Sequence, residues 1–94
     1  MKIFICEDDV RQRENIVSII NNYIMIEEKP MEIEVATSDP YEVLERAKEL
    51  KDIGCYFLDI QLEADINGIK LASEIRKYDP VSNIIFVTSH SELT

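Results

Sequence analysis

Short apolar runs alternate with longer amphipathic segments along this chain, and that alternation constrains the fold more than any other feature. The runs cover residues 2–6, 32–37, 55–58 and 84–87. The first, third and fourth are continuously apolar, which is typical of strands buried on both faces of a parallel sheet; the second alternates and predicts an edge strand. Parallel strands joined by helices form right-handed crossovers. The order therefore predicts an α/β, doubly wound parallel sheet.

The segments between the runs carry helical spacing and helix-end signals. Residues 10–25 show apolar side chains at helical intervals. In the next segment Asp39 can cap, Pro40 fits the first helical position, and Glu42 can bond back to the cap amide. A third helix follows Asn67-Gly68 and ends at Asp79-Pro80. The side chains predicted to point inward from the second and third helices are Tyr41, Leu44, Ala47, Leu50, Ile69, Leu71, Ala72 and Ile75.

Length and charge exclude several classes of protein. Ninety-four residues make one small domain, and 19 acidic against 10 basic residues give a net charge of −9. Such a surface disfavours nucleic-acid binding and anionic membranes. No apolar run is long enough to span a bilayer and the start is no signal peptide, so a cytoplasmic location without membrane contact is expected. If Asp8 is level with Asp59, Cys6 and Cys55 are offset by two residues and lie beyond disulfide reach.

The last residues predict a helix that the chain does not complete. Ser89 and Glu92 match a capping box, so a helix is expected to begin near His90, yet the sequence stops at Thr94. A helix of one turn is not stable alone. The chain is therefore expected to be a fragment of a larger domain.

Acidic residues follow two of the predicted strands. Glu7, Asp8 and Asp9 follow the first, Asp59 ends the third, and Thr88 ends the fourth. Ligands of open parallel sheets bind at these carboxyl ends. Converging carboxylates repel unless a cation or a shared proton intervenes, and an oxygen-only set suits Mg²⁺. A carboxylate beside Mg²⁺ can also act as a nucleophile that forms an aspartyl phosphate.

Other interpretations of the acids fit less well. They could be ordinary solvated loop residues. Acids at two strand ends and a hydroxyl group at a third make this less plausible. A haloacid-dehalogenase-type phosphatase needs Asp-x-Asp after the first strand, and a toprim-type site needs a second acid shortly after Asp59. A flavodoxin needs a hydroxyl- and glycine-rich phosphate loop where residues 7–9 stand.

The runs at residues 2–9, 55–62 and 84–91 resemble response-regulator receiver domains of the CheY-like fold, in particular those of quorum-sensing regulators with a LytTR-type DNA-binding domain. The resemblance covers residues 1–94 as one receiver domain, incomplete at its C-terminus. It implies strand order 2-1-3-4, truncated before the fifth strand and helix, and a DNA-binding LytTR domain in the full-length protein that is absent here. The missing part would include the lysine that pairs with the phosphoryl group and the aromatic switch residue.

The resemblance also implies a role for each matching residue. Asp59 matches the phosphoacceptor and Thr88 the switch hydroxyl. Glu7 and Asp8 match the acid pair that holds Mg²⁺ together with Asp59, Asp8 being the more direct ligand, and Gln61 matches the position whose backbone carbonyl completes the set. Asp9 is a third acid, more often dispensable. One departure is the loop at 62–68, which lacks the family's proline and is slightly long.

The implied function is regulatory rather than enzymatic. A sensor histidine kinase would donate the phosphoryl group, receivers would pair as dimers, and DNA would be bound only through the absent C-terminal domain. The alternative is a receiver-like interaction scaffold without phosphotransfer; a metal-dependent phosphatase is a weaker option. Arg11 and Arg13 could help to receive the kinase or could be solvated helix-face residues, and His90 is interpreted as a surface residue.

Overall fold

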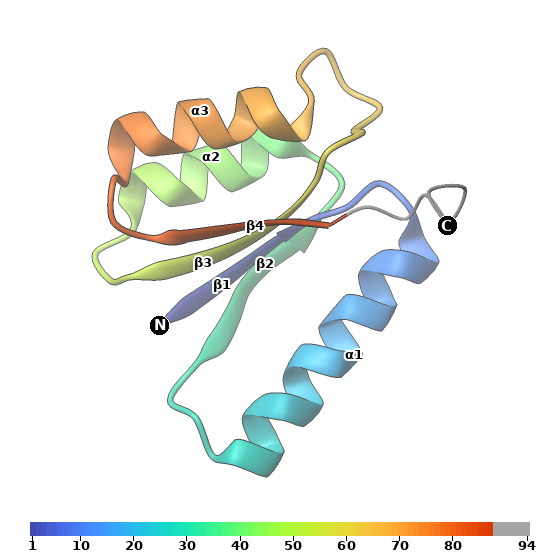
Figure 1. Cartoon of the computed structure of the whole chain (residues 1–94), viewed down its shortest axis with the longest axis vertical. Coiled ribbons are helices and arrows are strands. Elements are labelled where there is room, and N and C mark those ends of the chain that lie inside the picture. Colours follow the sequence, from blue (N-terminus) through green and yellow to red (C-terminus); the bar gives the residue numbers. More distant parts are fainter. Residues whose placement is uncertain (88–94) are drawn as a thin grey trace.

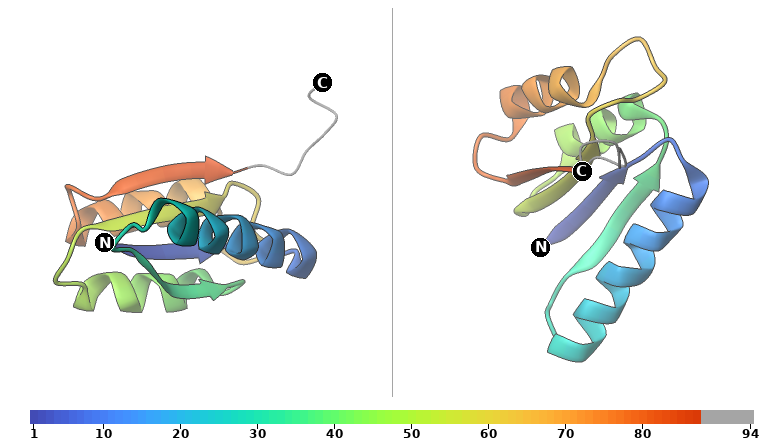
Figure 2. Two further views of the ribbon diagram at one scale, coloured as in Figure 1. Left: turned by 90° about the horizontal axis from the view of Figure 1, so that it is seen from below. Right: turned by 45° about the vertical axis from the view of Figure 1, so that its right-hand side comes forward.

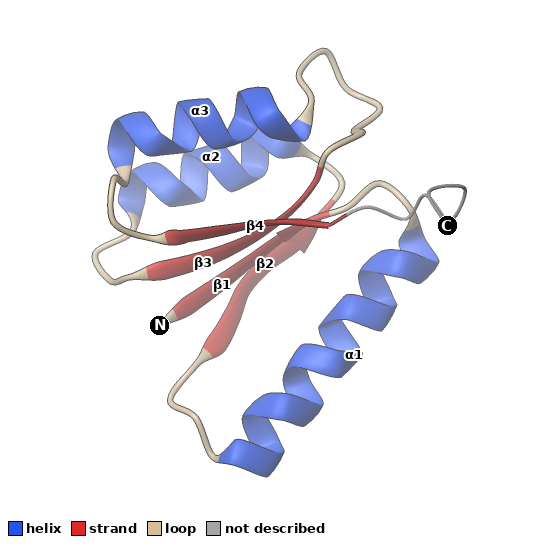
Figure 3. Cartoon of the chain, in the orientation of Figure 1, coloured by secondary structure: helices blue, strands red, loops and turns tan. Residues whose placement is uncertain are grey.

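The computed structural model describes residues 1–87, and within them strands and helices alternate strictly (Figures 1 and 3). The capping box at 89–92 and Thr88 lie outside the described residues. The predicted order is confirmed, as β1 (Lys2–Cys6), α1 (Val10–Glu27), β2 (Glu32–Thr37), α2 (Pro40–Glu49), β3 (Gly54–Asp59), α3 (Gly68–Tyr78) and β4 (Asn83–Val87).

The four strands form one parallel sheet in the predicted order β2-β1-β3-β4. Cys6 pairs with Leu58 and Ile3 with Cys55, so the two cysteines are offset by three residues, not two. The expected level of Asp8 with Asp59 is therefore wrong by one residue: Glu7, which follows Cys6, is level with Asp59. Both cysteines are free.

Helices cover both faces of the sheet, α1 on one and α2 with α3 on the other (Figures 1 and 2). Alternate residues of β1 feed the two cores: Ile3 and Ile5 pack with α1, while Phe4 and Cys6 pack with α2 and α3. This explains why β1 is apolar throughout. Its neighbour β3 is buried on the α2–α3 face but only partly buried on the other, where α1 lies over β1 and β2.

β4 is less buried than its sequence predicts. Ile85 and Phe86 are each 44% exposed, although this run was expected to be buried. Among the described residues β4 has a strand neighbour only on its β3 side, so its other edge and parts of both faces lie open. An apolar strand at a sheet edge is a ready surface for pairing with another chain segment.

The predicted faces of α2 and α3 are correct in part. Ala47, Leu71, Ala72 and Ile75 are buried as expected, but Tyr41 and Ile69 are 45% and 58% exposed. The sheet selects Pro40, Val43 and Ala47 on α2, one residue out of phase with Tyr41. The predicted bond from Glu42 to the cap amide is also absent: the Asp39 amide donates instead to Thr37 Oγ1 at 3.0 Å, and Asp39 caps through its own side chain.

A buried polar cluster fastens the end of the sheet opposite the acids. The Asp79 carboxylate accepts hydrogen bonds from the Ser82 amide and hydroxyl and from the Tyr56 hydroxyl. Ser82 Oγ in turn accepts from the Gly54 amide at 2.7 Å. Burial alone would raise the pKa of Asp79, but these donors outweigh it and the pKa is lowered. The cluster thus joins the end of α3 to the first residues of β3.

No helix in residues 1–87 is both long and apolar enough to cross a bilayer.

We predict that Glu28→Gly stabilises the protein. Glu28 ends α1 with φ 51° and ψ 43°, the left-handed region that a non-glycine residue occupies at a penalty. Glycine should raise the free energy of unfolding by about 0.5–1 kcal/mol, net of its greater freedom in the unfolded chain. Urea unfolding measures this. The control Glu27→Gly removes the same charge inside the helix and should destabilise; equal effects of the two variants would contradict the explanation.

Candidate functional site

The acidic residues gather at the carboxyl ends of β1 and β3. Glu7 directly follows β1 and Asp59 ends β3, and the strand register places them side by side. The Glu7 amide donates to the Thr37 carbonyl of β2 at 2.9 Å, which continues the sheet one residue beyond the strand. Both carboxyl groups are withdrawn from water, with Glu7 2% and Asp59 6% exposed. The structure thus brings together two of the predicted site residues most closely.

Glu7 is held where an ionised carboxylate is unfavourable. Its Oε2 accepts from the Asp9 amide at 3.2 Å, but Oε1 is buried without a hydrogen-bond donor in the described structure. The group contacts the Asp59 carboxyl, which can be a hydrogen bond only if one of the two is protonated. Burial, followed by this contact and the nearby negative charges, raises the pKa of Glu7 to about 7.

Asp8 is directed differently from Glu7. Its Oδ2 accepts a short hydrogen bond from the Glu63 amide, in the loop between β3 and α3. The Asp8 carboxylate is therefore bound to the loop that follows β3, four residues after Asp59. Its negative charge still contributes to the raised pKa of Glu7. The same field acts on Cys6 beneath the site, where burial and then these carboxylates raise the thiol pKa to about 12.

The β3–α3 loop, residues 60–67, is well anchored although it lacks the family's proline. Leu62 is buried in the core, and the Tyr41 hydroxyl donates to the Asp65 carboxylate at 2.7 Å. The Gly68 amide donates to the Ile60 carbonyl at 3.0 Å, which closes the loop at its base. These contacts give the loop a defined shape around the acids. The exposed Tyr41, expected in the core, thus has a role in holding it.

Asp9 is a helix cap rather than a member of the acid site. Its Oδ1 accepts from the amides of Arg11 and Gln12 at 2.8 and 3.2 Å. A carboxylate there satisfies donors that the first turn of a helix leaves free. Asp9 was expected to be the dispensable one of the three acids after the first strand, and its role as a cap agrees with that expectation.

The acid side chains at this edge of the sheet offer only oxygen atoms, the ligands that a hard divalent cation prefers. Within residues 1–87 no group of three or more Asp, Glu, His or Cys side chains is arranged as a metal centre. The buried, donor-free Oε1 of Glu7 beside the Asp59 carboxyl nevertheless has the chemistry that a hard cation satisfies, because it would neutralise two facing carboxylates. The Glu7–Asp59 pair therefore fits a cation, and Asp8 is the adjacent third acid.

Two predicted site residues remain less defined. The Gln61 amide donates to Asp59 Oδ1 at 3.1 Å, which places its backbone beside the predicted phosphoacceptor. Thr88 lies outside the described residues. Val87, which precedes it, pairs with Asp59 in the β3–β4 ladder, so β4 ends at the same edge of the sheet.

Arg13 is a residue whose place at the site the sequence left open. From α1 its Nη1 donates to the Glu7 carbonyl at 2.7 Å and lies 3.5 Å from the Asp8 carbonyl. Arg13 follows Glu7 by six residues and Asp8 by five. At this spacing a long side chain from the start of a helix can reach back to the residues that precede the helix. That spacing was the signal available in the sequence.

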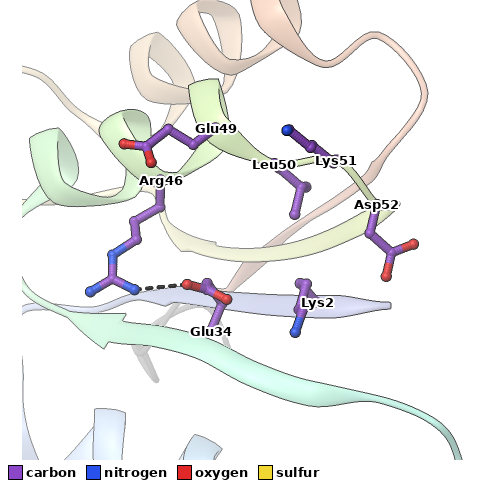
Figure 4. A pocket seen from close by; sticks show the side chains of 7 residues that line it. All are labelled: Lys2, Glu34, Arg46, Glu49, Leu50, Lys51 and Asp52. Atoms are coloured by element: carbon purple, nitrogen blue, oxygen red, sulfur yellow. Dashed lines mark hydrogen bonds and ion pairs between the residues drawn. The ribbon is translucent and has the colours of Figure 1, made fainter.

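A separate groove of about 510 Å³ lies at the other end of the sheet and is not part of this site (Figure 4). It is lined by charged side chains of both signs, and Arg46 Nη1 pairs with Glu34 Oε2 at 2.7 Å across it. Lys2 and Asp52 of the lining also have partners of opposite sign, Glu32 and the N-terminal ammonium respectively. Much of the charge in the groove is therefore already paired within the protein.

Comparison with known proteins identifies close relatives. A sequence model of the response regulator receiver domain matches residues 3–94. Accessory gene regulator protein A of Staphylococcus epidermidis is 84% identical over 94 residues, which is all of this chain and 40% of that protein. The protein of the same name from Staphylococcus aureus is 81% identical over the same span. The chain therefore covers about two fifths of these curated relatives.

Solved structures agree on the fold. The N-terminal domain of a response regulator/sensory box/GGDEF 3-domain protein from Carboxydothermus hydrogenoformans superposes with a TM-score of 0.77 at 24% identity, over 97% of this chain and 66% of that one. The MaeR response regulator bound to beryllium trifluoride superposes with a TM-score of 0.64 at 23% identity, over 99% and 70%. At this identity the two similarities concern the fold alone.

We predict that Gly68→Ala disrupts the site. A Cβ at Gly68 would lie 2.1 Å from the Asp59 carbonyl oxygen, so the start of α3 or the end of β3 must shift. We expect a loss of about 1–3 kcal/mol in unfolding free energy, as for other overpacked positions, together with shifted amide resonances at residues 59–61. Gly54→Ala is the control, since its Cβ would meet side-chain atoms at 3.1–3.3 Å. Equal responses of the two variants would contradict this view.

We also predict that stability falls with rising pH in the presence of a chelator. The pKa of Glu7 is near 7 in the folded protein against about 4.5 when unfolded, so between these values the folded state binds more protons. The associated stabilisation is present below pH 4.5 and is lost as pH rises to 7, by up to about 3 kcal/mol. Glu7→Gln should flatten this part of the urea-derived pH profile. An unchanged slope in the variant would refute the assignment to Glu7.

Proposed function

Because this chain belongs to the response regulator receiver domain family, we propose that Asp59 accepts a phosphoryl group from a histidine kinase with the help of Mg²⁺. The observation that supports this most directly is the buried pair of Glu7 and Asp59, level at the ends of neighbouring strands, with an acid oxygen that lacks a donor. An acid that only contacts solvent would not be buried beside another carboxyl group.

Each residue has a part in the proposed reaction. An Asp59 carboxylate oxygen attacks phosphorus, the phosphorus–nitrogen bond of the phosphohistidine breaks, and the imidazole leaves. Mg²⁺, held by Glu7, Asp8, Asp59 and the Gln61 carbonyl, would supply charge neutralisation around the phosphoryl oxygens. The Gln61 amide already donates to Asp59 Oδ1, which orients the nucleophile. Thr88 would contact the product phosphoryl group.

The longer protein would convert this modification into gene regulation. The name of the relatives, accessory gene regulator protein A, supports a role in gene regulation. We propose that the longer protein is cytoplasmic and that a DNA-binding domain lies in the part of these relatives that this chain does not span. The net charge of −9 agrees with DNA contact elsewhere in that protein. Dimers would form through receiver surfaces of the longer protein.

The test is phosphorylation by a small donor such as phosphoramidate, with the 94-residue chain and the full-length protein in parallel. We expect a Mg²⁺-dependent mass increase of one phosphoryl group in the full-length protein, abolished by Asp59→Asn. The control Glu63→Gln removes an exposed acidic side chain of the same loop but keeps the backbone amide that binds Asp8, and it should leave labelling intact. Full-length protein that folds, binds Mg²⁺ and takes no phosphate would instead favour the scaffold function.

A further inference from the structure

Arg13 occupies an unusual place for a helix-surface arginine. It lies in the first turns of α1, yet its side chain turns back to the strand-to-helix connection instead of outward to solvent. Nη1 donates to the Glu7 carbonyl at 2.7 Å in a partly buried setting, and the Asp8 carbonyl lies 3.5 Å away. A charged donor to a carbonyl is among the stronger hydrogen bonds of a protein. The contact therefore constrains the backbone of both acids at once.

The contact matters because the two acids diverge. Glu7 must face Asp59 across the sheet edge, while Asp8 must face the Glu63 amide in the next loop. Their common backbone follows the last residue of β1 and precedes the cap of α1 at Asp9. The ladder of the sheet ends with the bond from the Glu7 amide to the Thr37 carbonyl. Beyond it, the carbonyls of Glu7 and Asp8 depend on local bonds such as the one from Arg13.

We propose that Arg13 is a positioning residue of the acid site, which holds the carbonyls of Glu7 and Asp8 so that their carboxylates keep these separate directions. The expected effect on Mg²⁺ binding rests on the proposed function. The placement of the two carboxylates by Arg13 does not depend on a metal. Arg13 itself touches no reacting atom.

The sign of the effect on Mg²⁺ distinguishes positioning from simple charge. A guanidinium near a cation site repels the cation, so removing it should tighten binding if charge alone matters. If Arg13 positions the acids, its removal should weaken binding despite the loss of a positive charge. Arg11 provides the matched control: it lies in the same first turn and is exposed, and its backbone amide, not its guanidinium, contacts the Asp9 cap.

The experiment compares Arg13→Met with Arg11→Met by NMR. In chelator, amide hydrogen exchange is measured at Asp9 and Glu63, whose amides donate to the Glu7 and Asp8 carboxylates. Mg²⁺ is then titrated. For Arg13→Met we expect about tenfold faster exchange at both amides and about tenfold weaker Mg²⁺ binding, as for a lost charged hydrogen bond. For Arg11→Met we expect unchanged exchange and unchanged or slightly tighter binding.

The outcomes separate this proposal from the proposed function. Exchange in Arg13→Met that matches the wild type, or Mg²⁺ binding that tightens as in Arg11→Met, overturns the positioning role. A wild-type chain that does not respond to Mg²⁺ counts against the proposed function, while the exchange measurement still decides the role of Arg13. If Arg13→Met does not fold, Arg13→Gln decides, because it removes the charge and shortens the side chain: weaker Mg²⁺ binding with faster exchange supports positioning, and unchanged or tighter binding with wild-type exchange refutes it.

Discussion

The register between β1 and β3 is the constraint on which the site depends. Because Cys6 pairs with Leu58, the next residues along, Glu7 and Asp59, end side by side with their carboxyl groups in contact. Burial and this contact raise the pKa of Glu7 to about 7, because a charged carboxylate is unfavourable in such a position. A proton or a cation at this position would reduce the repulsion between the two carboxyl groups.

The surroundings of this pair are arranged from three separate elements. The amide that follows Asp59 by two residues donates to its carboxylate, the loop after β3 binds Asp8, and α1 returns a guanidinium to the Glu7 carbonyl. Gly68 lets α3 begin against the backbone of Asp59. These contacts come from two crossovers of the sheet, the one through α1 and the one through α3, so the site can form only when the helices on both faces are packed.

Sequence patterns predicted the elements well but the helix faces less well. Helix α1 begins at Val10 as predicted and extends two residues beyond Met25. The faces of α2 and α3 were partly misplaced at Tyr41 and Ile69, because apolar side chains occupy two adjacent phases of each helix and only packing against the sheet selects one. Asp9 was listed beside the site acids, as the dispensable one, because a cap and a ligand look alike in sequence.

The sequence by itself determined the doubly wound parallel sheet and the edge at which the acids gather, because continuous apolar runs joined by helical crossovers admit few other arrangements. The order of the strands came from the resemblance to receiver domains and not from these runs. Tertiary structure alone decided which acid meets Asp59. A register difference of one residue moves a strand-end side chain to the opposite face of the sheet. That register is set by packing across the sheet, not by local spacing. It also decided that Arg13 turns inward, a contact that depends on where α1 lies over β1.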